Sequence, residues 1–464
     1  MYDNLPKKRL EDSFFVSLQK SPGEAGGRLV TGLDGSQRSF FIAALANNVS
    51  QAALVLTSDM ARAERFYEEI KAFLPEMEVC LFPGKDFFYS GEILTQSKEI
   101  LQQRLTVLKK LVTGQRLLVI APVPALLSKL TPADLWRKKR LEIEAGLRVD
   151  WENFLKDLVE LGYERTELTE NKGSFSVRGD IVDIFPLYTS LPLRISFFDE
   201  EVESIRYFDA ESQRSLETIP AVTILPAHEV LLSTDSFQKG ISAIAAEMEK
   251  VAAQLKIKNQ ARAADRLRTK VDNHLVKLRN LGYFDGIEQY ISYFYAEPSS
   301  LIDYFPAGGL LFWDDPENVA SAGDSLLKEL QDYQAELLLQ GDILPGQMQI
   351  YWTLKDILQE NNLNIVALTS LSRRLPHIPV SSTINIQARS VPSFMGRLNL
   401  FEDELKEWWS LGYEVFLMCD GEKRAAEMQR ILREMELNAI FPAERTGLLK
   451  KFENGWRLNS SPGK

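Results

Sequence analysis

The residues between Gly32 and Ser39 have the spacing of a loop that could hold phosphate. They follow the apolar strand pattern RLVT and precede an apolar helical pattern, which is the context of the G-x-x-x-x-G-K-[ST] phosphate-binding loop. Gly32 and Ser39 fit this pattern, but Gln37 stands in place of the second glycine and Arg38 in place of the lysine. A Cβ at Gln37 restricts the backbone that must curl around phosphate, and the planar guanidinium of Arg38 does not replace a compact ammonium.

A second feature of nucleotide-hydrolysing sites is an apolar strand that ends in two acids. The run GGLLFWDD ends in Asp314 and Asp315. Asp314 could hold magnesium, whereas Asp315 is one methylene shorter than the glutamate that would orient an attacking water. We therefore predict a degenerate nucleotide loop, with no catalytic residue, no metal and no cofactor. An ordinary strand–turn–helix predicts the same inactivity, and a residual ATP-binding or ATP-hydrolysing site is the alternative.

Arginine and aromatic residues alternate with apolar residues in the segment 174–208. Strand side chains point alternately to two faces, so Arg194 and Phe198 share the face opposite to the apolar residues of LPLRISFFD. Arg178 takes the corresponding face of the preceding strand pattern. If the two strands are neighbours, the three side chains form an exposed patch of the kind enriched at protein interfaces. Alternatively, Phe198 lies under a loop and both arginines pair with the acids at 199–201.

The elements that would position these residues follow from hydrophobic periodicity. Apolar runs alternate with helical patterns over residues 28–132, which predicts a parallel sheet covered by helices. A helix and alternating strands then indicate an inserted α+β domain. We expect an α/β domain in two parts (1–136 and 228–335), the insert (137–227), a linker (336–348) and a second small α/β domain (349–455).

The net charge of the chain limits the kinds of partner that it can bind. The formal net charge of −11 argues against a basic coat for DNA over the whole surface, because phosphate binding needs clustered cations. The segment 249–279 is the exception, since nine lysines and arginines accompany three acids there. Weak, non-specific DNA contact through this segment is one interpretation, and a solvated helix face is the other.

Cysteine, histidine and hydropathy patterns limit the class of protein further. Cys80 and Cys419 lie far apart in apolar runs, as buried thiols of a reducing compartment do. The three histidines have no metal-ligand spacing. The first 20 residues lack the apolar core of a secretory signal, and no apolar run reaches the ~18 residues that would span a bilayer. We expect a cytoplasmic protein without membrane contact.

Several segments resemble one known family. GSFSVRGDIVDIFP, LRISFFDEEVESIRYFD, SQRSL and ILPAHE resemble the UvrB-like amino-terminal region of transcription-repair coupling factors, and weaker collinear matches extend over about residues 28–450. The resemblance implies a degenerate RecA-like or helicase-like domain whose phosphate loop no longer works. It also implies an inserted domain that binds the repair ATPase UvrA through Arg178, Arg194 and Phe198.

The resemblance also implies a function and a set of partners. A module of this kind recruits UvrA and so links stalled transcription to nucleotide excision repair, without ATPase activity of its own. In that family RNA polymerase and DNA are contacted by regions beyond this chain, which also contain the translocase ATPase. A carboxyl-terminal domain is thought to mask the UvrA-binding face, so we expect that face to be open here.

Overall fold

A computed structural model of the protein describes residues 26–85 and 98–437, apart from short gaps. The gaps are 360–361, 372–373, 387, 389–390, 392, 414, 416 and 418–420. Within the described chain, no helix is long and apolar enough to cross a membrane.

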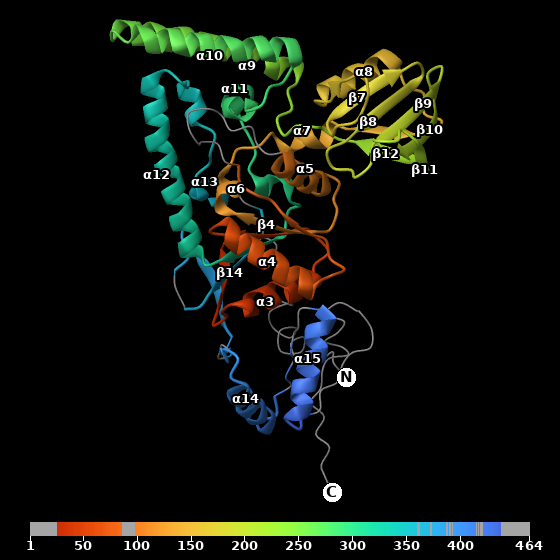
Figure 1. Cartoon of the computed structure of the whole chain (residues 1–464). Helices are drawn as coiled ribbons and strands as arrows, with labels where there is room; N and C mark the ends of the chain where they lie inside the picture. Colours follow the sequence, from red (N-terminus) through yellow and green to blue (C-terminus); the bar gives the residue numbers. More distant parts are fainter. Residues whose placement is uncertain are drawn as a thin grey trace.

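A seven-stranded parallel sheet forms the centre of the described chain (Figure 1). Its strands are β1 (Gly27–Thr31), β2 (Ala53–Thr57), β3 (Val79–Leu81), β4 (Leu118–Pro122), β13 (Leu310–Asp314), β14 (Asn364–Thr369) and β15 (Val380–Asn385). They lie in the order β15-β1-β14-β13-β2-β4-β3, and every neighbouring pair is parallel. Most of these strands are apolar throughout because both faces of a parallel sheet are covered.

Helices cover both faces of this sheet. One face carries α3 (Ser36–Asn47) and α4 (Met60–Phe73), and the other carries α5 (Lys98–Val112), α6 (Val123–Leu127), α12 (Pro316–Gln340) and α13 (Leu354–Gln359). Successive residues of β2 contribute to different cores, since Val55 packs on the α3 side and Leu54 on the α5 side. The predicted parallel, helicase-like α/β domain is therefore confirmed.

The predicted boundary at residue 349 is wrong. β14 lies between β1 and β13 and pairs with both, and β15 pairs with the other edge of β1. Residues 364–385 therefore complete the large sheet and do not open a separate domain. The predicted linker 336–348 is also packed, because it contains the end of α12 and the short helix η4 (Pro345–Met348), with Leu344 and Gln347 buried.

The inserted domain contains a six-stranded, mostly antiparallel sheet in the order β11-β10-β9-β8-β7-β6. The strands are β6 (Glu164–Arg165), β7 (Ser174–Arg178), β8 (Ile181–Phe185), β9 (Leu193–Phe198), β10 (Glu201–Phe208) and β11 (Ser215–Ile219). Helix α8 (Trp151–Glu160) packs on one face, where the ring of Trp151 lies edge-on to Phe197 with centroids 5.0 Å apart. A two-stranded sheet of β5 (Leu141–Glu144) and β12 (Ala221–Ile224) completes the insert.

Two long helices follow the insert. α9 (Thr234–Ile257) and α10 (Ala261–Leu281) pack side by side as a hairpin, which Figure 1 shows projecting from the top of the molecule. The short helices η2 (Ile287–Tyr290), α11 (Ile291–Phe294) and η3 (Leu301–Tyr304) return the chain to the sheet at β13. The basic segment 249–279 therefore lies on this hairpin.

A buried glutamate just after the insert joins that segment to its surroundings. Glu229 binds Arg104 of α5 at 2.6 Å and Lys85 after β3 at 2.7 Å. Lys85 also lies 3.3 Å from Glu288 of η2, so α5, the end of β3, the segment after the insert and η2 meet in one ion cluster. Burial alone would raise the pKa of Glu229, but the two cations outweigh burial and lower the pKa to about 2. Nearby, α7 (Ala133–Lys138) places Trp136 Nε1 3.3 Å from the Glu229 carbonyl oxygen.

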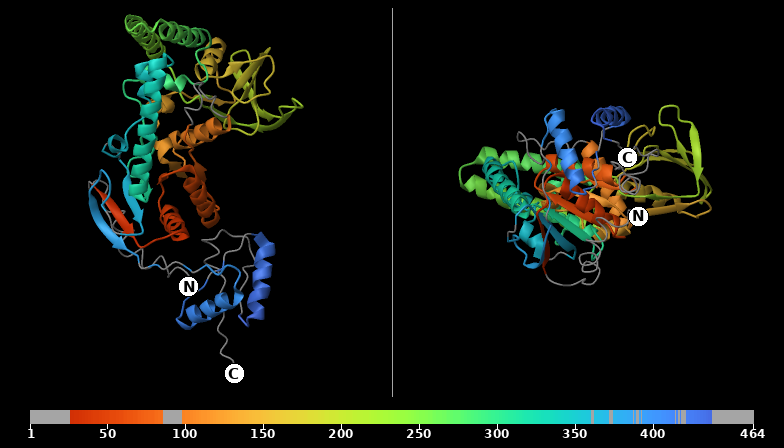
Figure 2. Two further views of the ribbon diagram at one scale, coloured as in Figure 1. Left: turned by 60° about the vertical axis from the view of Figure 1, so that its left-hand side comes forward. Right: turned by 90° about the horizontal axis from the view of Figure 1, so that it is seen from below.

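The last described elements are α14 (Leu398–Ser410) and α15 (Gly421–Glu434). They share a small core that includes Phe401, Leu405 and Leu432. Figure 1 and Figure 2 show both helices at the end of the molecule opposite to α9 and α10. Residues 414, 416 and 418–420, and everything after 437, lie outside the described residues, so the second small α/β domain stays a prediction for this part of the chain.

Candidate docking surface and former nucleotide loop

The strand register brings the three predicted patch residues to one face of the inserted sheet. Arg178 pairs with Ile181 across β7 and β8, and Ile181 pairs with Ser196 across β8 and β9. Cross-strand partners share a face, and so do residues two apart, which places Arg194 and Phe198 on that face too. The other face packs against α8, as the burial of Leu193 and its alternate neighbours shows. We call the face that carries Arg178, Arg194 and Phe198 the outer face.

A buried aspartate holds the two arginines together. Asp183 is 1% exposed and projects from β8 toward the outer face, opposite Arg194. Its carboxylate accepts hydrogen bonds from Arg194 Nε at 2.7 Å and Nη2 at 2.9 Å, and from Arg178 Nη2 at 2.5 Å. The geometry at Arg194 is bidentate, which fixes the plane of the guanidinium as well as its position.

The turn between β10 and β11 braces the same guanidinium groups. Gln213 adopts a left-handed backbone with φ of 58°, and its carbonyl oxygen accepts a hydrogen bond from Arg194 Nη1 at 3.0 Å. Its side-chain oxygen lies 3.3 Å from Arg178 Nη2. The Arg194 guanidinium also lies 4.4 Å from the centre of the Phe208 ring. The hydrogen bond to Asp183 raises the pKa of Arg194, so the cation stays charged.

Phe198 remains open to solvent at the end of β9. Its exposed fraction is 78%, which excludes the alternative that it lies under a loop. The arginines pair with Asp183, so pairing with the acids at 199–201 is also wrong. The carboxylates of Asp199 and Glu200 instead lie 3.9 and 4.0 Å from Arg148. The side chain of Arg178 is 44% exposed and that of Arg194 14% exposed, so the outer face presents a phenyl ring beside one open and one mostly covered cation.

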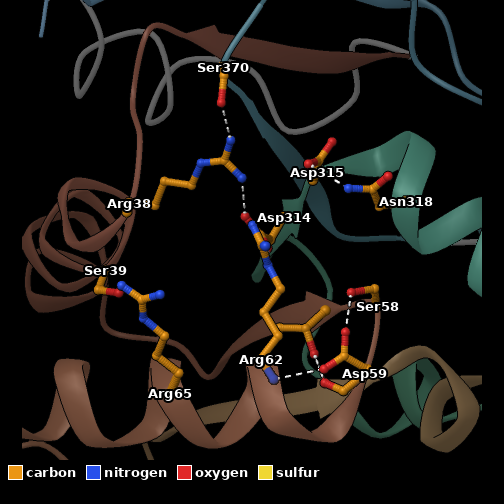
Figure 3. Close-up of polar contacts among 12 residues, drawn as sticks. Arg38, Ser39, Ser58, Asp59, Arg62, Arg65, Asp314, Asp315, Asn318 and Ser370 are labelled. Carbon is orange, nitrogen blue, oxygen red and sulfur yellow. Dashed lines mark hydrogen bonds and ion pairs between the residues drawn. The ribbon is translucent and has the colours of Figure 1, made fainter. Parts of the chain in front are cut away.

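The predicted degenerate nucleotide loop, residues 32–39, has a different arrangement (Figure 3). It lies at the carboxyl ends of β1, β13 and β14, where ligands of open α/β sheets bind. Arg38, in place of the lysine, turns inward and binds Asp314 at 2.6 Å and the hydroxyl oxygen of Ser370 at 2.8 Å. Arg62 of α4 binds the second oxygen of Asp314. The carboxylate that would hold magnesium in a working site is therefore occupied by two guanidinium groups.

The loop also satisfies its own hydrogen-bond donors. The backbone N–H of Asp34 donates to the side-chain oxygen of Gln37 at 3.0 Å, and that of Gly35 donates to the Asp34 carboxylate at 2.9 Å. These N–H groups belong to the loop that would curl around a phosphate. Gln37 thus replaces the second glycine, and its side chain also accepts the hydrogen bond of one N–H group that would otherwise be available to a phosphate.

A glutamate carboxylate stands beside the first turn of α3. Glu69 of α4 accepts hydrogen bonds from Ser36 at 3.0 Å and from Ser39 at 2.5 Å. In a working loop the hydroxyl at the position of Ser39 coordinates magnesium. Asp315 accepts a hydrogen bond from Asn318 Nδ2 at 2.8 Å. A phosphate at this loop would be repelled by the carboxylates of Asp34 and Glu69. The nearby N–H and hydroxyl donors already form hydrogen bonds within the protein.

Gly32 keeps a role that does not involve a ligand. Its φ is +86°, and a Cβ at this position would lie 2.0 Å from the carbonyl oxygen of Ile386. Ile386 N–H donates to the Thr31 carbonyl oxygen at 2.9 Å, and Thr31 Oγ1 lies 3.1 Å from Asn385 Oδ1. The chain after β15 therefore lies directly against the loop, and the first glycine is required by that contact.

The two further predicted features have simpler outcomes. Four of the nine cations in 249–279 form ion pairs, namely Lys256, Arg266, Arg268 and Lys270. DNA contact by these helices stays a prediction. Among the residues that the structure describes, no group of three or more histidine, cysteine, aspartate or glutamate side chains could hold a metal ion.

Relatives were found by comparison with curated proteins. A transcription-repair-coupling factor of Bacillus subtilis (strain 168) is 30% identical over 423 residues, which are 91% of this chain and 36% of that protein. A transcription-repair-coupling factor of Staphylococcus aureus (strain MRSA252) is 28% identical over 441 residues, 94% of this chain and 37% of that protein. The chain thus spans about a third of the length of the curated relatives it matches.

Two families match parts of the chain. Residues 141–230 match the UvrB interaction domain and residues 235–296 match the UvrB third helical domain. Together with the helicase-like sheet, they define the class as a UvrB-like module with an inserted interaction domain. Within that class, the chain corresponds to the amino-terminal region of the transcription-repair coupling factor family.

Proposed function

We propose that this chain is a docking module that recruits UvrA and so couples stalled transcription to nucleotide excision repair. The observation that carries the proposal is the outer face, where Arg178 and Arg194 share one buried carboxylate beside the exposed ring of Phe198. The match of residues 141–230 to the UvrB interaction domain supports the same assignment. RNA polymerase and DNA would be contacted by other regions of a longer protein.

The geometry suits protein recognition. Arginine and aromatic side chains are enriched at interface hot spots, where they combine directed hydrogen bonds with a large apolar area. Because Asp183 and Gln213 hold Arg194 in place, little side-chain entropy would be lost when a partner binds. Phe198 would bury its ring against the partner, which gives an apolar contact next to the cations.

Binding to purified UvrA tests the proposal. Phe198→Ala should weaken binding about tenfold or more, and Arg194→Ala combined with Phe198→Ala should weaken it about 100-fold or more. The matched control is Arg165→Ala, which removes an exposed arginine of the same sheet that shares a face with Phe175, away from the outer face. Full binding by the double variant would overturn the assignment of these residues.

The proposed module does not hydrolyse ATP. The support is that Asp314 is occupied by Arg38 and Arg62, and that the loop's own side chains accept hydrogen bonds from Asp34 N–H and Gly35 N–H. A nucleotide would have to displace a buried ion pair before magnesium could reach Asp314, at a cost of several kcal/mol.

Phosphate release and thermal unfolding test this second statement. With ATP and magnesium in excess, we expect no release above the protein-free rate and no change in melting temperature. The variant Gln37→Gly with Arg38→Lys restores the loop pattern and serves as the comparison. The alternative, a residual ATP-hydrolysing site, would be favoured if the unaltered chain released phosphate and if Arg38→Ala changed the rate of that release.

A further inference from the structure

A third arginine lies on the outer face, in register with the two already described. Arg206 of β10 pairs directly with Arg194 of β9, and Arg194 pairs with Asp183 of β8. The neighbouring residues of β10 confirm the orientation, because Ile205 is buried on the α8 side while Ser204 pairs with Ser196 on the outer face. Asp183, Arg194 and Arg206 therefore form one row across three adjacent strands.

The two arginines of this row differ in their partners. Arg194 donates to Asp183 and to Gln213. Arg206 is exposed, and in the part of the chain that the structure describes no carboxylate lies within 4.0 Å of its guanidinium. Its neighbour on the other side, across β10 and β11, is the neutral Thr218. Among the described residues, Arg206 thus has no ion-paired carboxylate, and it lies beside another cation.

Such a placement is unfavourable for the isolated domain. Like charges directly opposite each other on an antiparallel pair destabilise the sheet, and Asp183 is already shared between Arg178 and Arg194. The outer face carries the buried carboxylate of Asp183 and the exposed one of Glu201, which pairs with Phe198, against three guanidinium groups, so positive charge is in excess there. A carboxylate supplied from outside would remove this repulsion.

We propose that Arg206 is a further contact residue of the docking surface, which extends from Phe198 across β10 and binds a carboxylate-bearing surface of the partner protein. The inference rests on the proposed function, since the partner is the UvrA of that proposal. A protein surface fits better than phosphate, because the exposed phenyl ring of Phe198 lies on the same face and needs an apolar contact.

Charge reversal at Arg206 tests the inference. Arg206→Glu should weaken UvrA binding at least tenfold and make it less sensitive to salt, and Arg206→Lys should have an intermediate effect because it keeps the charge without the planar fork. Arg165→Glu is the matched control and should leave binding within twofold. The melting temperature of the Arg206→Glu variant should equal or exceed that of the unaltered chain, because the change relieves the repulsion with Arg194.

The outcomes separate this inference from the proposed function. One outcome overturns the role of Arg206 alone. In it, the variant with Arg194→Ala and Phe198→Ala loses UvrA binding, whereas Arg206→Glu binds UvrA as well as the control Arg165→Glu does. Absence of UvrA binding by the unaltered chain overturns both proposals. A lower melting temperature of Arg206→Glu in parallel with weaker binding would assign Arg206 a structural role, and competition by short duplex DNA would assign the face to phosphate. Either result contradicts the inference.

Discussion

Two buried aspartates each hold a pair of arginines, and the two sites differ in the elements that surround them. At the end of β13, Asp314 binds Arg38, whose side chain is 4% exposed, and Arg62, whose side chain is 37% exposed. On the inserted sheet, Asp183 binds Arg194 and also Arg178, whose side chain is 44% exposed. The ion-pair chemistry is the same in both places. Each pair includes one partly exposed arginine, but the second pair also lies beside the exposed ring of Phe198 on the face of a sheet.

The surrounding elements explain this difference. The ends of three parallel strands and the first turn of α3 enclose Arg38, so its guanidinium fills the space where a ligand would bind. Asp183 lies on the outer face of an antiparallel sheet, and such a sheet can leave one face to solvent. The enclosed pair therefore contributes to stability, whereas the open pair is available for recognition.

The largest expected effect follows from removing the enclosed carboxylate. Asp314→Asn leaves the buried Arg38 guanidinium without a counter-charge, so the free energy of unfolding should fall by about 3–5 kcal/mol. UvrA binding should be unchanged at temperatures where the variant is folded, because the outer face is on another domain. Urea denaturation followed by fluorescence or circular dichroism measures the first effect, and calorimetric titration measures the second.

A paired substitution checks the electrostatic explanation. Arg38→Met combined with Asp314→Leu replaces the ion pair with apolar groups of similar volume and should regain most of the lost stability. If the double variant were as unstable as Asp314→Asn, packing rather than uncompensated charge would explain the loss. The comparison between the two aspartates would then fail.

A third buried acid extends the comparison through its pH dependence. The cations Arg104 and Lys85 lower the folded-state pKa of Glu229 to about 2, below the 4.5 of an unpaired glutamate. Its pairing with Arg104 and Lys85 therefore stabilises the fold fully above about pH 4.5, and this contribution is lost as the pH falls toward 2. The shift corresponds to a stabilisation on the order of 3 kcal/mol.

Unfolding of the Glu229→Gln variant between pH 7 and pH 3 measures this contribution. The variant should be less stable than the unaltered chain near neutral pH, and the difference should shrink as the pH falls below about 4.5. Glu217→Gln, at an exposed position of β11, is the control and should give no such convergence. A difference that stays constant with pH would exclude the ion cluster as its source.

The sequence predicted the residues of the outer face better than it predicted Asp183 and Gln213, which hold the arginines of that face in place. Alternation alone placed Arg194 and Phe198 on one face, because a strand has a period of two whatever its neighbours are. Asp183 was missed, although a signal existed. It is the one acid inside the apolar run IVDIF, between two strand patterns that carry arginine. Gln213 had no such signal, since its contact depends on a turn conformation with positive φ.

Errors in the sequence analysis arose where contacts are distant along the chain. The pairing of β14 with β1 joins residues 338 positions apart, such as Arg28 and Val366, and no local pattern specifies which parallel strands are neighbours. Arg38 was recognised as a poor replacement for lysine. Its bond to Asp314 was not predicted, because the two residues are also distant along the chain. Arg62 was missed entirely, because an arginine on a polar helix face carries no distinguishing signal.

The smallest and most specific expected effect follows from changing Asp183, the buried aspartate of the inserted sheet. Asp183→Asn keeps the shape of the side chain but removes the charge that holds Arg178 and Arg194. Arg178 can turn to solvent, so the loss of stability should be well below that of Asp314→Asn. UvrA binding should weaken about tenfold, or about 1.4 kcal/mol, because both cations lose their fixed positions.

The pair of aspartate-to-asparagine variants therefore separates the two regions. Asp314→Asn should change stability without changing affinity, and Asp183→Asn should change affinity with a smaller change in stability. Equal losses of stability in the two variants would contradict the role of burial, because Arg38 and Arg178 would then depend on their carboxylates alike. Unchanged affinity of Asp183→Asn would mean that the arginines do not need to be preorganised, and that their charge alone attracts the partner.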